Sequence, residues 1–509
     1  MFAFSNYLNP SKLTPFSTTE VIIATLQHFI TYSSFILLII FIITVLSVKS
    51  NWNSKHNANF FNLVKYINIT LIGIILFCVL FKFILFLWNI KSQTLLLISS
   101  NYITAKFNYL PYRPFLDLNN SFLSDAVILL AFSSGLVCIY LLGEKNLTKH
   151  LSNISIFSIF LVAIIAMVYT TNLLVMFIGF ECLFVPTLYY VFTQGYVQRA
   201  DKTLKVLLCW TLLGAFMVLS SLAYLYYKYK TLQYFQLVSI KFSTQESFLL
   251  YMFIFLGFGI KVPVFPFHYW LTKIHVEAPA GFSIFLSGFL VKAALYCFYY
   301  FNLIFESKSY TYIVVTVAIF GVVESSFKMW NQTDFKKLIA FATIQEMNLI
   351  LLLLVSYQNI LDYSLVLFIL IHGWLSTLMF YLVDVIQKKT NSRNIVEISG
   401  LAYKFPEIRF IVWFIIIFFT GFPLTVKFVI EWAVLSTLIL QHQVLFMSVF
   451  FVIVAFGAAG FTKQMLIILY GMARYNINVN HTLAKRDKRL LYLIILILVA
   501  LNAINFFLS

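Results

Sequence analysis

Charged residues are scarce in this sequence of 509 residues: Asp, Glu, Lys and Arg make up 10% of the chain, whereas hydrophobic residues make up 61%. Ordinary globular proteins carry about 25% charged residues, so a soluble surface cannot be built from this composition. A mean hydropathy of +0.92 indicates that the apolar environment is lipid. The sequence therefore excludes a string of soluble domains and predicts one polytopic membrane domain.

Several kinds of functional site are also missing from the sequence. The five cysteines lie inside apolar runs without C-x-x-C spacing, which argues against a disulfide framework and a metal site. No glycine-rich phosphate loop, Ser/His/Asp arrangement or axial histidine pair at haem spacing appears. Residues 1–19 show no signal-peptide pattern. We therefore expect the chain to bind no cofactor and no metal.

The charge balance is basic, with 35 Lys and Arg against 18 Asp and Glu and a net charge of +17. The basic residues are scattered between apolar runs, which is typical of membrane loops, and no polar stretch is long enough for a nucleic-acid module. The densest basic cluster, Lys485 to Arg489, is expected to contact lipid headgroups. Membrane lipid is thus an expected partner and nucleic acid is not.

About 14 apolar stretches are long enough to cross a hydrocarbon core of about 30 Å, and backbone hydrogen bonding in lipid requires them to be helices. The predicted fold is an all-α polytopic membrane protein with short loops. It divides into residues 1–120 (two helices, near 21–48 and 67–88, and a polar loop), 121–305 and 306–475 (the two halves of the main domain), and 476–509 (a basic segment and a final helix).

Two of the predicted spans contain helix breakers in their interior. The first runs from Phe248 through Gly257, Gly259, Lys261 and Pro263 to Pro266, and the second from Phe410 through Gly421 and Pro423 to Glu431. In a membrane, broken backbone is tolerated only where protein or water surrounds it. Paired interrupted helices are typical of internally repeated transporters, whose ion path lies at the breaks. The repeat is inferred from hydropathy, because the two halves show no direct sequence identity.

Ionisable side chains occur inside several spans, where a charge costs about 2.5–3.5 kcal/mol on insertion scales. They are Glu181, Lys205, Lys261, Lys292, Glu346, His372 and Glu431. An ion pair between Glu and Lys stabilises the charged form of both partners, and separating them reverses that effect. A buried pair can therefore release a proton when one partner moves, so the series predicts a proton path.

A purely structural role is the alternative for each of these residues. For Lys205, a snorkelling side chain near the start of its helix is an equally good interpretation. Lys292 and Glu181 lie deep in their spans, where snorkelling is hardest, so a functional role is favoured for both. For His372, a functional role is favoured only because it occurs in the same series of charges. Three further charged residues are assigned structural roles, Glu324 and Lys328 as an i,i+4 pair and Asp384 near a polar helix end.

The segment from Lys261 to Ser283, continuing to Lys292, resembles the signature of the antiporter-like proton-pumping subunits of respiratory complex I. Its H-x-E-A-P stretch, His275 to Pro279, is similar to the subunit 4 branch of that family rather than to subunits 2 and 5. Other matching pieces follow in order, namely Phe180-Glu181 with Pro186, Gln332 to Phe341, His372 with Leu378, Ser399 to Leu401 with Pro406, and Gly421 to Glu431. The resemblance covers about 125–433, and the flanking residues match only in hydropathy.

The resemblance implies 14 helices with two inverted five-helix repeats, broken at the same two spans. It implies that Glu181 pairs with Lys261, and that Lys292 and His372 continue a central hydrated axis that Glu431 ends. Where the family usually has His-Met, this chain has Glu346-Met347, so a carboxylate replaces an imidazole relay.

The resemblance also implies a subunit of an NADH:ubiquinone reductase that carries no redox site itself. NADH, FMN, iron–sulfur clusters and ubiquinone would bind elsewhere in the complex, and the partners would be other membrane-arm subunits, the paralogous subunits 2 and 5 among them. The implied location is the mitochondrial inner membrane. The 57 Phe and 30 Tyr suggest the A- and T-rich codon usage of many organelle genomes. The alternative is a subunit of a multisubunit monovalent cation/proton antiporter, which shares these motifs and would exchange Na⁺ or K⁺ for H⁺.

Overall fold

The computed structural model describes residues 118–141, 159–184, 187–189, 192, 197–305, 308–356, 363–432, 444–472 and 483–508. Within these ranges the chain is helical, with two isolated β-bridges and no strand. The predicted early spans near 21–48 and 67–88 lie outside the described residues.

Between the described helices from 197 to 305 and from 363 to 432, the connections are short, as expected from the sequence. In chain order the elements are α3 (Leu118–Leu141), a helix at Ile159–Tyr169, α5 (Leu173–Cys182), α7 (Val197–Tyr229), α8 (Tyr234–Val238), α9 (Thr244–Lys261), α10 (Tyr269–Glu277), α11 (Ala280–Phe285), the π-helix η1 (Leu286–Leu290), α12 (Val291–Ile304), α13 (Lys308–Met329), α14 (Phe335–Ser356), α15 (Tyr363–Thr390), α16 (Leu401–Lys404), α17 (Pro406–Phe419), a helix at 426–432, α19 (Val444–Tyr470) and α20 (Lys485–Leu508).

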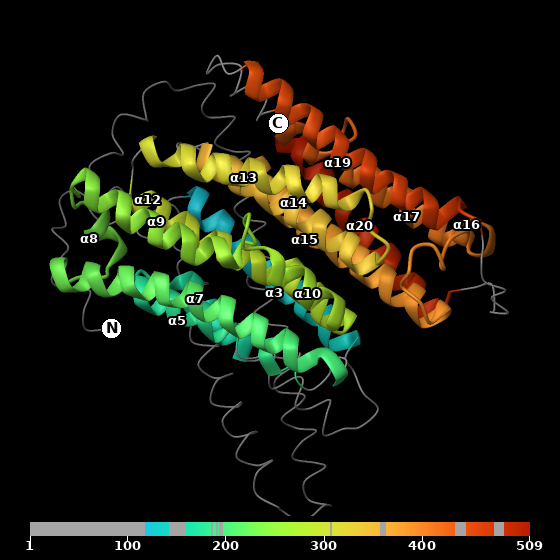
Figure 1. Ribbon diagram of the computed structural model, residues 1–509, viewed down its shortest axis with the longest axis horizontal. Helices are drawn as coiled ribbons and strands as arrows, with labels where there is room; N and C mark the ends of the chain where they lie inside the picture. Colours follow the sequence, from blue (N-terminus) through green and yellow to red (C-terminus); the bar gives the residue numbers. More distant parts are fainter. Residues whose placement is uncertain are drawn as a thin grey trace, which may run out of the picture.

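Burial separates the helices into a central set and an outer set. Six helices in the described residues are long and apolar enough to cross a membrane. The apolar windows of Ala280–Ile304 and Phe335–Val355 are 100% buried, whereas only 33% of the window in Asp201–Tyr229 is buried. Figure 1 shows α12, α14 and α15 between α5 and α7 on one side and α17 and α19 on the other. The central helices are those that carry Lys292, Glu346 and His372.

The first predicted break is confirmed between α9 and α10. Here α9 ends at Lys261 and α10 begins at Tyr269. The Trp270 indole donates a hydrogen bond to the Ile260 carbonyl at 2.7 Å, and the Asn348 amide of α14 donates to the Pro263 carbonyl at 3.4 Å. The irregular backbone is therefore satisfied by protein groups, as a membrane interior requires.

The second predicted break is confirmed between α17 and the helix at 426–432. Asn502 of α20 binds the C-terminal side of this turn, because its Oδ1 accepts from the Val426 amide at 2.8 Å and its Nδ2 donates to the Leu424 carbonyl at 2.7 Å. Gly421 lies in the turn with φ +69°, the left-handed region that favours glycine. A Cβ at this position would lie 2.7 Å from Oε2 of Glu431. The turn thus requires both Asn502 and Gly421.

Candidate functional site: buried charges at the two breaks

The first buried ion pair joins Glu181 and Lys261, as predicted. Lys261 is the last residue of α9, and its ammonium donates a hydrogen bond to Oε1 of Glu181 in α5. The Lys261 side chain is completely buried, whereas 28% of the Glu181 side chain is exposed. Gly257 allows α7 to approach α9, because a Cβ there would lie 2.5 Å from Cγ2 of Val218. The pair is therefore held where the first membrane helix breaks.

Aromatic rings surround the Lys261 ammonium on the side of α5. Its Nζ lies 4.7 Å from the ring centroid of Phe180, 5.1 Å from that of Phe184 and 5.8 Å from that of Phe177. The faces of such rings attract a desolvated cation by about 2 kcal/mol or more. The rings and Glu181 together therefore offset part of the cost of burying this ammonium.

Lys292 lies one residue beyond the start of α12, directly after the π-helix η1. Its ammonium donates to the carbonyl of Ser287, within η1. A π-helical turn replaces the usual i→i+4 ladder, and such turns are frequent at functional sites. The Glu346 carboxylate of α14 acts electrostatically on this buried ammonium. Lys292 is thus buried near Glu346, and its place on a proton path stays a prediction. The π-helix η1 was not predicted.

His372 is buried in α15, and neither of its ring nitrogens has a hydrogen-bond partner among the described residues. The ammonium groups of Lys292 and Lys427 both act electrostatically on its ring. An unsatisfied buried polar group costs about 1–3 kcal/mol. Water that reaches the ring would relieve this cost, so the imidazole could join a hydrated path near the two lysines.

A second buried ion pair, which the sequence reasoning missed, joins Lys427 and Glu346. Lys427 follows the second break, and its ammonium donates to Oε1 of Glu346 and to the carbonyl of Phe419, at the end of α17. The same Nζ lies 3.7 Å from Oε1 of Glu431. The side chains of Lys427 and Glu346 are only 6% and 3% exposed. The sequence did contain a signal, because Lys427 stands beside the second set of breakers as Lys261 stands beside the first.

The structure does not bring Lys205 to the other predicted site residues. Its ammonium forms an i,i+4 ion pair with Asp201 at 2.8 Å, and the two side chains are 71% and 77% exposed. A lysine early in α7 can reach the helix surface, so the snorkelling interpretation is the one that the geometry supports. The three residues assigned structural roles form i,i+4 pairs, Glu324 with Lys328 at 3.7 Å and Asp384 with Lys388 at 2.5 Å.

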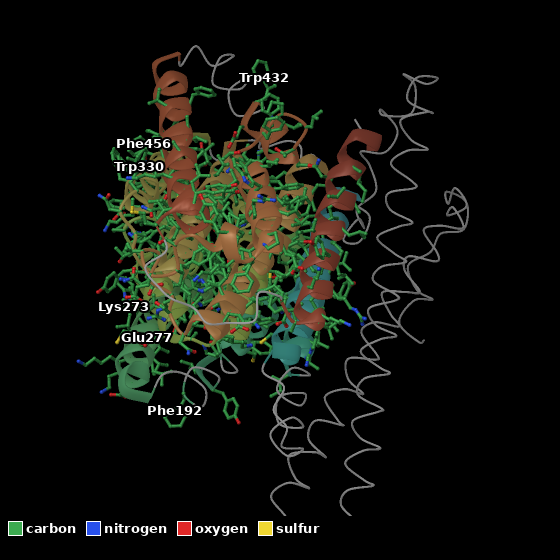
Figure 2. The ribbon with its side chains drawn as sticks, turned by 90° about the vertical axis from the view of Figure 1, so that its right-hand side faces the viewer. Phe192, Lys273, Glu277, Trp330, Trp432 and Phe456 are labelled. Atoms are coloured by element: carbon green, nitrogen blue, oxygen red, sulfur yellow. The ribbon has the colours of Figure 1, made fainter. Side chains whose placement is uncertain are left out.

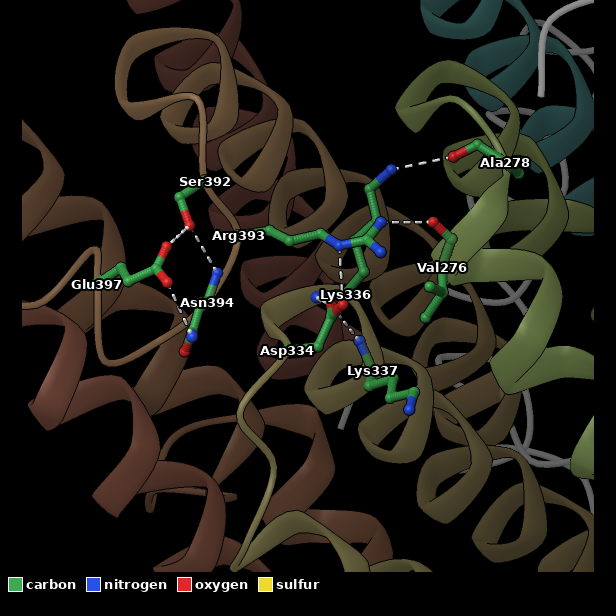
Figure 3. Close-up of polar contacts among 9 residues, drawn as sticks. All are labelled: Val276, Ala278, Asp334, Lys336, Lys337, Ser392, Arg393, Asn394 and Glu397. Atoms are coloured by element: carbon green, nitrogen blue, oxygen red, sulfur yellow. Dashed lines mark hydrogen bonds and ion pairs between the residues drawn. The ribbon is translucent and has the colours of Figure 1, made fainter. Parts of the chain in front are cut away.

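The H-x-E-A-P stretch is anchored by two cations from other segments, which the sequence did not predict. Lys336 at the start of α14 donates to the Ala278 carbonyl at 3.0 Å, and Arg393 donates to the Val276 carbonyl at 2.6 Å. Figure 3 shows both cations pointing at this stretch, with Asp334 on the other side of Arg393. Asp334 forms an ion pair with Nε of Arg393 at 2.8 Å and accepts from the Lys336 amide at 2.9 Å. These contacts fix the end of α10.

Comparison with known proteins places this geometry in a family. Residues 170–457, more than half of the chain, match the NADH:quinone oxidoreductase/Mrp antiporter transmembrane family. NADH-ubiquinone oxidoreductase chain 4 of Paramecium tetraurelia is 34% identical over 428 residues, which are 82% of this chain and 89% of the relative. The chain belongs to the NADH-ubiquinone oxidoreductase chain 4 family. Its predicted site residues, from Glu181 to Glu431, all lie inside the matched segment.

The chain is also similar to a bacterial protein and, in fold, to solved structures. NADH-quinone oxidoreductase subunit M of Rickettsia conorii is 29% identical over 269 residues, which are 52% of this chain and 54% of that relative. A chain of respiratory complex I from Thermus thermophilus with bound aureothin superposes with a TM-score of 0.67 at 16% identity, covering 95% of this chain and 96% of the other. At this low identity the superposition shows a shared fold, which is that of a multi-pass membrane protein.

Proposed function

We propose that the chain is a proton-translocating membrane-arm subunit of an NADH:ubiquinone oxidoreductase. The observation that carries this proposal is the buried Glu181–Lys261 pair at the first helix break, in a chain of the chain 4 family. A scaffold without a transport role would gain nothing from costly charges at that depth. The redox chemistry, with NADH, FMN, iron–sulfur clusters and ubiquinone, would take place in other subunits.

In the proposed mechanism, redox energy released elsewhere shifts the Glu181–Lys261 pair. When the Lys261 charge moves relative to its carboxylate, the electrostatic field along the central helices changes. Lys292 then gives up its proton in the low-dielectric interior, and the proton passes by way of His372 toward Glu431. Each cycle returns Lys292 to the ammonium form by uptake of a proton from the opposite side, so charge and protons balance.

The proposal extends to architecture, with 14 membrane helices and two inverted five-helix repeats. The two breaks support it, because each is followed by a helix that continues away from a buried lysine. In Figure 2, Lys273 and Glu277 of the helix after the first break lie low in the view, whereas Trp432 of the helix after the second lies at the top. Opposite directions at the two breaks are what an inverted repeat would produce.

We place the chain in the mitochondrial inner membrane, next to other membrane-arm subunits that include the paralogous subunits 2 and 5. The names of the relatives in Paramecium, Acanthamoeba and Chondrus support this assignment, as does the composition. Large apolar side chains on the outer face of α7, such as Leu212 and Phe216, are exposed and would contact lipid or a neighbouring subunit.

A native gel of membranes solubilised in mild detergent tests the proposal directly. The gel is probed for this chain and stained for NADH dehydrogenase activity, and we expect both signals at the same very high mass. If the chain ran in a small assembly apart from that activity, the multisubunit antiporter would replace this proposal. A proton gradient dependent on sodium in sealed vesicles would then identify the exchanged cation.

A further inference from the structure

The second break holds an unequal set of charges, with two carboxylates and one ammonium. Lys427 donates to Glu346, whereas Oε1 of Glu431 has no hydrogen-bond partner among the described residues. The 3.7 Å between Nζ of Lys427 and that oxygen is too long for a hydrogen bond. Only 17% of the Glu431 side chain is exposed, so water cannot fully compensate its charge. Lys427 thus forms a hydrogen-bonded ion pair with Glu346, whereas its contact with Glu431 is only electrostatic.

Two neighbouring side chains, Lys292 and His372, interact electrostatically with these three charged groups. Lys292 acts on Glu346, and the imidazole of His372 is influenced by both Lys292 and Lys427. With both lysines and both glutamates ionised, the four groups sum to zero. If a proton passes from Lys292 to Glu346, the sum is still zero, but Lys427 and Glu431 are then the only charges left.

We propose that Lys427 is a partner-exchanging positioning residue, pairing with Glu346 while that carboxylate is ionised and with Glu431 once Glu346 has taken the proton. The inference rests on the proposed function and adds a second ion-pair switch to it. The proton leaves Nζ of Lys292 directly or through His372, binds a carboxylate oxygen of Glu346, and moves on to Glu431 when Lys427 returns. Lys427 stays protonated throughout.

The Lys427 ammonium would have to move only a short distance to exchange partners. Lys427 and Glu431 are four residues apart on one helix, so they share a face of it. The Phe419 carbonyl, which also accepts from the Lys427 ammonium, holds the cation at the break between its two carboxylates. Rotation about the side-chain bonds of Lys427 and Glu431 would close the 3.7 Å gap without any movement of the helices.

The same geometry accounts for Glu346 standing where the family usually has histidine. A neutral imidazole needs no counterion, whereas an ionised carboxylate at this depth is stable only beside a cation. Lys427 supplies that cation. The identities of residues 346 and 427 should therefore depend on each other, even though the two residues are 81 positions apart in the chain.

A double-mutant cycle in the full chain, assembled in its membrane complex, tests the exchange. The variants are Glu346→His, Lys427→Gln and the double variant, with Lys205→Gln as a control at an exposed pair. Protons moved per electron are measured in sealed vesicles with NADH. We expect each single change to lower proton translocation roughly tenfold, a coupling typical of charges in contact, and the double variant to recover most of it. Additive losses in the double variant would overturn the proposal.

Lys427→Arg provides a second test that does not depend on removing the charge. Because Arg cannot be deprotonated, it can replace a cation that stays charged but not a lysine that carries the proton. We expect Lys427→Arg to assemble and to pump, and an assembled variant that does not pump would contradict the mechanism. Infrared difference spectra on NADH addition should show protonated carboxylic acid bands from Glu346 and Glu431. We expect Glu346→His to remove the first and Glu431→Gln the second, and a spectrum that Glu346→His leaves unchanged would overturn the role of Glu346.

Glu181→Gln separates failure of the inference from failure of the proposed function. If Glu181→Gln lowers the ratio of protons to electrons while the cycle at 346 and 427 is additive, the exchange is wrong and the proposed function stands. If neither Glu181→Gln nor any variant at the second break changes that ratio, the chain does not move protons and both proposals fall.

Discussion

A carboxylate and three aromatic rings lie around the buried Lys261 ammonium and offset part of the cost of its burial. Glu181, in contrast, is partly exposed. The two partners therefore respond unequally to a disturbance. A change that moves α5 shifts the carboxylate, while the lysine stays at the end of α9.

Glu181→Gln should therefore uncouple proton movement without preventing assembly. Removing one partner of a buried ion pair costs about 3–5 kcal/mol, because the other charge is left uncompensated. We expect protons moved per electron to fall below the ratio of the unaltered complex by the share that this subunit contributes. The measurement is proton uptake against NADH oxidation in sealed vesicles, with Asp201→Asn at the exposed pair as the matched control. Normal pumping by Glu181→Gln would exclude the assigned role of this pair.

Burial of individual charged residues was predictable where a residue lies far from both ends of its apolar run. Glu181, Lys261, Lys292, Glu346, His372 and Glu431 all lie in or beside the central helices, as expected. Lys205 was ambiguous because a long side chain near a helix start can reach the surface. Lys427 was missed although it stands beside the second set of breakers, and its pairing with Glu346, 81 positions away on another helix, follows from no local pattern.

At the scale of elements, the two breaks are built in the same way. In each, a buried lysine lies beside the break, and an asparagine from a distant helix satisfies the exposed backbone: Asn348 at the first and Asn502 at the second. Hydropathy predicted the breaks from their Gly and Pro content. It could not predict the role of these asparagines, because the sequence around a polar residue in an apolar helix does not indicate which backbone group that residue will bind.

Asn502→Leu should weaken the second break. The substitution removes the partner of the buried Val426 amide, which costs about 1–3 kcal/mol, and also that of the exposed Leu424 carbonyl. We expect a lower melting temperature of the chain in the detergent-solubilised complex. Thermal aggregation, detected specifically for this chain, provides the measurement. Asn331→Leu, at an exposed position, is the control. An unchanged melting temperature for Asn502→Leu would show that the break is stable without α20.

Two glycines near the breaks should respond oppositely to alanine. At Gly421, alanine would have to adopt a left-handed φ, at about 1–2 kcal/mol, and its Cβ would lie 2.7 Å from the Glu431 carboxylate. At Gly259 the nearest atom to a Cβ is 3.7 Å away, so alanine fits within α9. We expect Gly421→Ala to lower the yield of assembled complex several-fold, and Gly259→Ala to leave it unchanged. Equal yields would contradict the requirement for glycine in the turn.

The π-helix η1 marks a limit of prediction at this scale. The sequence from Leu286 to Leu290 is apolar with one Ser and one Gly, and such a composition fits an ordinary helix equally well. What distinguishes the site is packing: a Cβ at Gly288 would lie 3.0 Å from Cβ of Ser134 and 3.3 Å from Oγ1 of Thr377. Contacts with α3 and α15 shape this turn, and they exist only in the folded chain.

For the molecule as a whole, apolar composition does not distinguish the buried central helices from the exposed outer ones. The windows in α7 and α14 have the same mean hydropathy, 2.1, yet 33% of the first and 100% of the second is buried. Both helices were predicted correctly as membrane spans. Which of them meets lipid could not be predicted, because lipid and a membrane-protein core favour the same side chains.

This division predicts the pattern of labelling by a photoactivatable apolar probe dissolved in the bilayer. Peptides from α7 and α13 should be labelled, since Phe216 and Phe320 are exposed, whereas peptides from α14 should not. Mass spectrometry of the digested chain provides the measurement. Loss of α7 labelling in the intact complex, with its recovery after mild dissociation, would locate a neighbouring subunit on that face. Labelling of α14 would contradict the central position of this helix.

The contact between Asn502 and the second break also has a consequence for biogenesis. Val426 and Asn502 are 76 positions apart, so when the break enters the membrane its backbone groups have to wait for α20 to be synthesised and inserted. Until then, Lys427 and Glu431 belong to a turn that is not yet fixed. An insertase or assembly factor that shields this turn would be needed only during that interval, and arrival of α20 would release it.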